Sequence, residues 1–180
     1  MKSLTKIAVG LMISGALVAS NSSMAASDGT LGTDSTGQSV VSLEVQDRVQ
    51  ISDVEDIALG AYSGTGTMVG EVEYCVYRNG ADNYKVTLTT SQAAFQIQSA
   101  TTTDTIAFSV KVDDDLDAGA GGEALSYNTA SAVALAGSAQ ADCGGSDNGA
   151  IEVTFAEAAL QAVGSANDYQ ATMTVLVEPI

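Results

Sequence analysis

Histidine and tryptophan are both missing from the 180 residues of this sequence. Without histidine there is no Ser-His-Asp triad, no Cys-His pair and no metal site built on imidazole ligands. Without tryptophan, and with only six Tyr and three Phe, the chain also lacks an aromatic platform for sugars. Catalysis by carboxylates alone stays open in principle, but no carboxylate spacing in this sequence indicates it. We therefore expect no enzyme activity and no cofactor.

Basic residues are scarce, with six Lys and Arg against 22 Asp and Glu. Two of the six, Lys2 and Lys6, lie at the very N-terminus, and without them the chain has four basic residues and a net charge of about −18. Such a charge repels nucleic acid and anionic lipid, so we exclude both as partners. An acidic surface of this kind favours solubility outside the cell.

Long apolar runs are also missing, since no segment reaches the roughly 20 apolar residues that span a bilayer. A shorter, mainly apolar stretch of about a dozen residues, Ile7–Val18, follows the two N-terminal lysines. After it, Ser23 and Ala25 place small residues at the −3 and −1 positions of a signal-peptidase site. The sequence therefore predicts a signal peptide over residues 1–25, with cleavage after Ala25 or, as second choice, after Ala26, and an exported protein.

The chain has two cysteines, Cys75 and Cys143. In an oxidising compartment an even pair predicts a disulfide, and the wide spacing differs from the CxxC of a redox pair. Because the bond would close a long loop, the chain-entropy model gives a stabilisation of about 4 kcal/mol.

The first part of the exported chain changes character at Ser39. Residues 26–38 are polar and rich in Gly, Ser and Thr, which predicts a flexible N-terminal tail. After that point apolar residues share one parity as far as Ile51, with Asp47 between the two halves. This period-2 alternation predicts extended chain with one apolar face, as two strands joined near Asp47 or as one long strand with a break.

Further alternating segments predict an all-β domain over residues 39–180. They cover 54–62, 69–77, 84–90, 95–98, 106–112, 151–155 and 169–177. Asn79-Gly80 supplies the positive φ of a tight hairpin, residues 156–162 suggest one turn of helix, and 124–141 is either a weak strand or irregular. Short strands at regular spacing, with almost no helical periodicity, favour a β-sandwich.

An acidic, glycine-rich loop over residues 113–123 partly matches a calcium loop. Asp113, Asp115 and Asp117 occupy positions 1, 3 and 5, but Ala118 replaces the glycine of position 6 and the glutamate falls one place early, at Glu123. The flanks read as strands, so a solvated hairpin tip is our expectation and no metal site is predicted. A loose extracellular calcium site is the alternative.

The alternating segment after the tail has two possible partners. Val41, Leu43 and Val45 can complete the open groove of another subunit by strand addition, with Leu31 further out. The same residues can instead pair within their own domain, and periodicity alone favours that second reading.

A family resemblance favours strand addition instead. The runs that carry it are Val40–Val45, Val49–Ile51, Asp56–Gly60, Cys143, Ile151–Phe155, Leu160, Gly164, Tyr169 and the terminal strand to Ile180. Together they resemble chaperone–usher pilin domains, closest to the archaic and alternative branches with their spore-coat-U-like domains. One difference is that archaic subunits usually carry a cysteine in the first strand, where this chain has Val49.

The resemblance implies an incomplete immunoglobulin-like sandwich and a structural role in a surface pilus or fimbria. Val41, Leu43 and Val45 would be donor residues, and Met173, Val175 and Val177 would line the acceptor edge. A periplasmic chaperone would fill the groove first, an outer-membrane usher would collect the complex, and other pilin subunits would then replace the chaperone strand at the cell surface. The alternative is a monomeric secreted β-sandwich that binds through its loops or serves as a matrix protein.

Overall fold

The computed structural model describes residues 26–180, so the predicted signal peptide lies outside the described residues. The chain divides into two compact units after Val45. In the first, Ser27 and Gln38 exchange main-chain hydrogen bonds of 3.1 and 2.9 Å, which close a small loop within the stretch predicted as a tail. Residues 39–48 belong to no strand.

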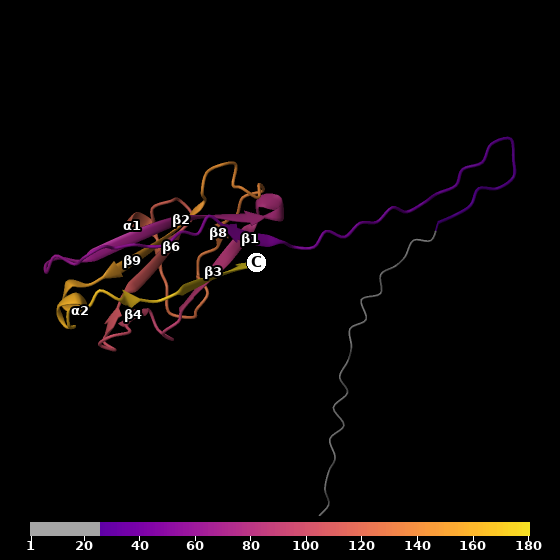
Figure 1. Ribbon diagram of the computed structural model, residues 1–180. Helices are drawn as coiled ribbons and strands as arrows, with labels where there is room; N and C mark the ends of the chain where they lie inside the picture. Colours follow the sequence, from indigo (N-terminus) through magenta and orange to yellow (C-terminus); the bar gives the residue numbers. More distant parts are fainter. Residues whose placement is uncertain (1–25) are drawn as a thin grey trace, which may run out of the picture. The chain divides into compact units, whose positions relative to one another are not determined.

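The second unit is mostly β (Figure 1). Its strands are β1 (Val49–Ser52), β2 (Met68–Arg78), β3 (Asn83–Thr90), β4 (Gln96–Ser99), β5 (Thr105–Ala107), β6 (Ser109–Asp113), β7 (Glu123–Ala124), β8 (Leu135–Ala136), β9 (Gly149–Phe155), β10 (Tyr169–Gln170) and β11 (Met173–Pro179). Its helical elements are the 3-10 turn η1 (Asn79–Ala81), α1 (Ala118–Gly121) and α2 (Glu157–Gln161). No helix among residues 26–180 is long and apolar enough to cross a membrane.

The strands form three antiparallel sheets. The largest has the order β1-β2-β9-β6-β7, and the others have the orders β11-β3-β8 and β10-β4-β5. Figure 1 shows β2, β9 and β6 running side by side, and the last strand, in yellow, ending near β3. The arrangement is sandwich-like, because the first two sheets contribute their inward side chains to one core.

Period-2 alternation explains which side chains enter this core. In β2 the even-numbered residues Val72, Tyr74 and Val76 are buried, and across the register Val72 lies opposite Ile151 of β9. In β3 the buried residues again alternate, at Tyr84, Val86, Leu88 and Thr90. The predicted strands over 69–77, 84–90 and 151–155 and the predicted helical turn are all present.

Other segments differ from the expectation. The alternating stretch 106–112 is split at Phe108, so that β5 pairs with β4 while β6 joins the large sheet. The last predicted strand is likewise split, with β10 and β11 in different sheets. Residues 53–62 form no strand; instead Ile57 and Leu59 pack onto Gly70 of β2, where an added Cβ would lie only 2.5 and 2.7 Å from their side chains.

Candidate functional site

Strand β11 lies at the edge of its sheet. It pairs with β3 from Met173↔Thr90 to Pro179↔Tyr84, and β3 is its only strand partner in the described part of the chain. A strand in this position offers one row of main-chain groups to a further strand.

The hydrogen bonds of β3 identify which groups of β11 face outward. The carbonyls of Val86 and Leu88 accept hydrogen bonds from Ser131 (2.8 Å) and Asn128 (2.9 Å), on the side of β3 away from β11. Their antiparallel partners are Val177 and Val175. Because directly opposite residues share one hydrogen-bonding state, the main chains of Val175 and Val177 point away from β3, toward the open edge. Met173 has the same parity.

The side chains of these residues point inward. Met173, Val175 and Val177 are half-buried and pack against the core, while Thr174, Leu176 and Glu178 between them are exposed. The edge therefore combines free main-chain groups with a strip of partly covered apolar side chains. This is the combination that strand addition uses.

The C-terminal end of this edge is closed. Pro179 has no N–H to donate to a ladder. The main-chain oxygen of Ile180 accepts a hydrogen bond of 2.9 Å from Nη1 of Arg78. An added strand therefore finds its free positions between Met173 and Val177.

The predicted donor residues are fully available in their own unit. Val41, Leu43 and Val45 are 93%, 87% and 72% exposed. A β-strand needs a neighbour for its main-chain hydrogen bonds. Residues 39–45 have none among the described residues, which explains why this alternating segment is not a strand while Val49–Ser52, paired with β2, is one.

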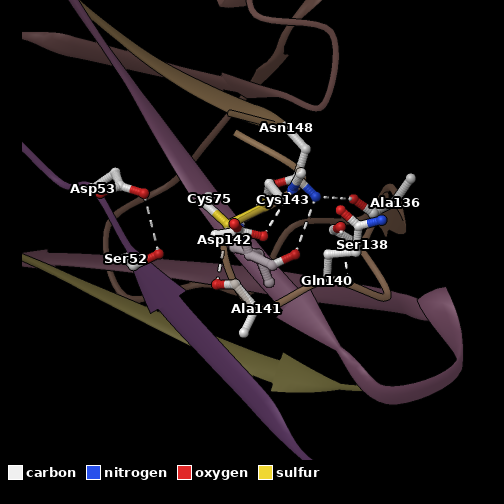
Figure 2. The surroundings of a disulfide bond; sticks show 12 residues. Ser52, Asp53, Cys75, Ala136, Ser138, Gln140, Ala141, Asp142, Cys143 and Asn148 are labelled. Carbon is white, nitrogen blue, oxygen red and sulfur yellow. Dashed lines mark hydrogen bonds between the residues drawn. A yellow bond between two sulfur atoms is a disulfide. The ribbon is translucent and has the colours of Figure 1, made fainter. Parts of the chain in front are cut away.

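The predicted disulfide is confirmed (Figure 2). It joins Cys75 of β2 to Cys143 in the loop before β9, with a Cα–Cα distance of 5.8 Å. Asn148 holds this loop against β2, since it accepts from Val76 N–H (2.7 Å) and donates to the carbonyls of Val76 (3.0 Å) and Ala136 (3.1 Å). The bond is structural, because it fixes this loop to β2.

The acidic loop residues accept main-chain hydrogen bonds. Asp113 accepts from the N–H of Asp114 (2.7 Å), Asp115 from Asp117 (3.1 Å), and Asp117 from Ala120 (3.0 Å), where it caps α1. Within residues 26–180 these carboxylates do not form a group that holds a metal ion. Burial raises the pKa of Asp113, with smaller contributions from the neighbouring acids.

The site residues predicted from the sequence do not include two polar side chains with several hydrogen bonds, Arg78 and Asp168. Arg78 has the same parity as the inward residues Val72, Tyr74 and Val76, so the alternation in the sequence could have predicted its burial. The sequence instead predicts a turn at this point. Asp168 accepts hydrogen bonds from Ser99 Oγ (2.6 Å) and Thr101 Oγ1 (2.7 Å), which lower its pKa. No local pattern marks Asp168, because its partners lie almost 70 residues earlier.

Comparison with known proteins gives no match, neither to a family model nor to a curated protein.

Proposed function

We propose that this chain is an exported structural subunit of a surface pilus, which polymerises when the N-terminal segment of one copy adds a strand to β11 of the next. The main support for this proposal is the open edge of β11. There the main-chain groups of Met173, Val175 and Val177 point outward, and their apolar side chains are half-buried. The same chain carries Val41, Leu43 and Val45, an exposed alternating segment without a strand partner among the described residues.

The strand order supports an incomplete immunoglobulin-like sandwich as part of this proposal. In such domains strands A, B, E and D form one sheet and C, F and G the other. If β1, β2, β3, β6, β9 and β11 are taken in chain order as A to F, the neighbours β1-β2-β9-β6 and β11-β3 follow that arrangement. The position beside β11 that strand G would fill is then the one offered to the next copy.

Strand addition has a clear driving force in this arrangement. Residues of the added strand that lie opposite Val175 and Val177 turn their side chains to the same face, toward the core. Apolar residues two apart, as in the donor segment, fit that face. Burying each such side chain contributes about 1.5–3 kcal/mol, and new main-chain hydrogen bonds add to it. A periplasmic chaperone and an outer-membrane usher are the proposed partners before polymerisation, acting on this same edge.

The test compares two substitutions in the donor segment of the chain that begins at Ala26. Val40 and Leu43 are both exposed, but they have opposite parity. We expect the unmodified chain to give ladders in non-boiled denaturing gels and oligomers in size-exclusion chromatography. Leu43→Asp abolishes both, because a carboxylate cannot enter the apolar strip, whereas Val40→Asp retains them.

Deletion of residues 27–45 must also abolish the ladders. Polymers that survive this deletion, or equal losses in Leu43→Asp and Val40→Asp, contradict the proposal. A heat-resistant monomer at every concentration of the unmodified chain contradicts it too and favours the monomeric secreted sandwich.

A further inference from the structure

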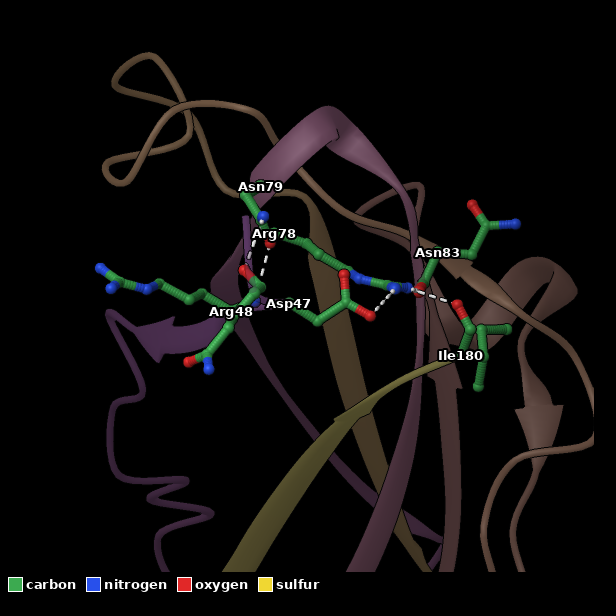
Figure 3. Close-up of polar contacts among 7 residues, drawn as sticks. Asp47, Arg48, Arg78, Asn79, Asn83 and Ile180 are labelled. Carbon is green, nitrogen blue, oxygen red and sulfur yellow. Dashed lines mark hydrogen bonds and ion pairs between the residues drawn. The ribbon is translucent and has the colours of Figure 1, made fainter. Parts of the chain in front are cut away.

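A buried arginine connects the two main sheets. Arg78 ends β2, and its side chain is only 3% exposed. Its guanidinium donates to the main-chain oxygens of Asn83 and Ile180 and, over 3.4 Å, to the carboxylate of Asp47 (Figure 3). Asp47 is the one carboxylate paired with this cation among residues 26–180.

The next residue, Asn79, holds the same short segment from the other side. Its Oδ1 accepts from the N–H of Arg48 (2.7 Å), and its Nδ2 donates to the carbonyl of Gln46 (3.1 Å). The Asn79 N–H also donates to the carbonyl of Arg48 (3.3 Å). Figure 3 shows the Asp47 side chain directed toward the guanidinium of Arg78.

The segment 46–48 is exposed and precedes β1, so it is not part of a β-strand. Beyond the strand pairing that ends at Val49↔Arg78, the segment is held by the side-chain hydrogen bonds and by the main-chain bond from Asn79 to Arg48. Separating Asp47 from Arg78 is unfavourable, because the buried guanidinium would then lack its counter-charge. Its Nε already lacks a partner among the described residues.

We infer that Arg78 and Asn79 form a clamp that fixes residues 46–48 on the sandwich and so sets the point at which the N-terminal segment is anchored. Arg78 and Asn79 are positioning residues in this role. The clamp also has a role in a polymer, which rests on the proposed function. There it bears tension applied to the donor segment, before β1 separates from β2.

The rate of trypsin cleavage after Arg48 measures, in the full chain, how often the clamped segment is released. Cleavage there requires local release of the clamped segment, whereas cleavage after Lys85 in β3 or Lys111 in β6 requires those strands to open. The variant is Asn79→Ala, which removes both side-chain hydrogen bonds to the segment. The matched control is Asn83→Ala, at the other end of the connection between β2 and β3; its side chain makes no hydrogen bond to a described residue. This connection is not the tight hairpin that the sequence predicts, because β2 and β3 lie in different sheets.

We expect Asn79→Ala to accelerate cleavage after Arg48 by about 10-fold, because losing two hydrogen bonds raises the population of the released segment. Cleavage after Lys85 and Lys111 stays unchanged, and Asn83→Ala behaves like the parent chain. Asn79→Asp, which keeps the acceptor for Arg48 and loses the donor to Gln46, gives an intermediate rate.

An unchanged rate after Arg48 in Asn79→Ala overturns the inference, and so does an equal acceleration at all three sites, which reports global destabilisation. These measurements are made on the monomer. They therefore stand or fall independently of polymer formation, which the gel ladders test.

Discussion

At the scale of single residues, two buried tyrosines carry an unpaired polar atom each. The hydroxyls of Tyr74 and Tyr84 are buried and interact with each other, but neither makes a hydrogen bond of ordinary geometry to a described residue. Burial raises the pKa of Tyr74 to about 12 and also raises the pKa of Tyr84. Above the ordinary value of 10.0 the unfolded chain loses these protons while the native state keeps them. Stability is therefore fully present below that pH and falls as the pH rises through the native pKa.

We expect Tyr74→Phe to flatten this alkaline loss and to leave the stability at neutral pH unchanged or higher by about 1 kcal/mol, because it removes an unsatisfied hydroxyl. Urea unfolding at pH 7 and at pH 11 measures both effects. A neutral-pH loss above 2 kcal/mol, on the order of a broken buried hydrogen bond, would show that the hydroxyl is satisfied.

Asp168 acts in the opposite direction. Hydrogen bonds from Ser99 and Thr101 lower its pKa, so its contribution is present above the ordinary value near 3.8 and is lost as the pH falls through the native pKa. We expect Asp168→Asn to be less stable than the parent at neutral pH and to show a weaker loss of stability between pH 5 and 2. Thermal unfolding across that range measures the difference, and parallel curves for the two proteins would contradict it.

At the scale of elements, two glycines allow close packing within the large sheet. A Cβ at Gly149 of β9 would lie 2.5 Å from the ring of Tyr74, which is fully buried, whereas a Cβ at Gly70 meets the half-buried Ile57 and Leu59. We expect both Gly→Ala substitutions to destabilise, by about 1–3 kcal/mol, with Gly149→Ala the worse because its neighbour cannot move aside. Chemical denaturation gives the order, and the reverse order would contradict this packing.

The same scale shows how far the sequence predicts the fold. Strands β2, β3 and β9 follow from long alternation, because each is central and its pattern reports one buried face. Strand β8, with two residues, and the division of 169–177 into β10 and β11 depend on partners that are distant in sequence. Within the candidate site, parity predicts the inward side chains of β11. The open edge follows only from knowing that β3 is its neighbour, and the clamp at Arg78 only from the approach of Ile180 and Asp47.

At the scale of the whole molecule, the disulfide is the strongest single constraint on the unfolded chain. It links residues 68 apart in sequence, and the described chain holds no free cysteine. We expect the double substitution Cys75→Ala and Cys143→Ala to lower the free energy of unfolding by about 2–5 kcal/mol. Denaturation of the variant beside the oxidised parent measures this, and a loss below 1 kcal/mol would mean that Asn148 and its hydrogen bonds hold the loop unaided.

During synthesis the chain emerges from its N-terminus, so β11 becomes available after the ten other strands described. Until then β3, with the buried Val86 and Leu88, is itself an unprotected edge of the kind that attracts foreign strands. Both cysteines precede β11, so their bond can close first and hold the scaffold to which β11 adds. Until β11 pairs with β3, a strand of another molecule can pair with β3 instead, so slow or failed docking of β11 exposes the molecule to aggregation.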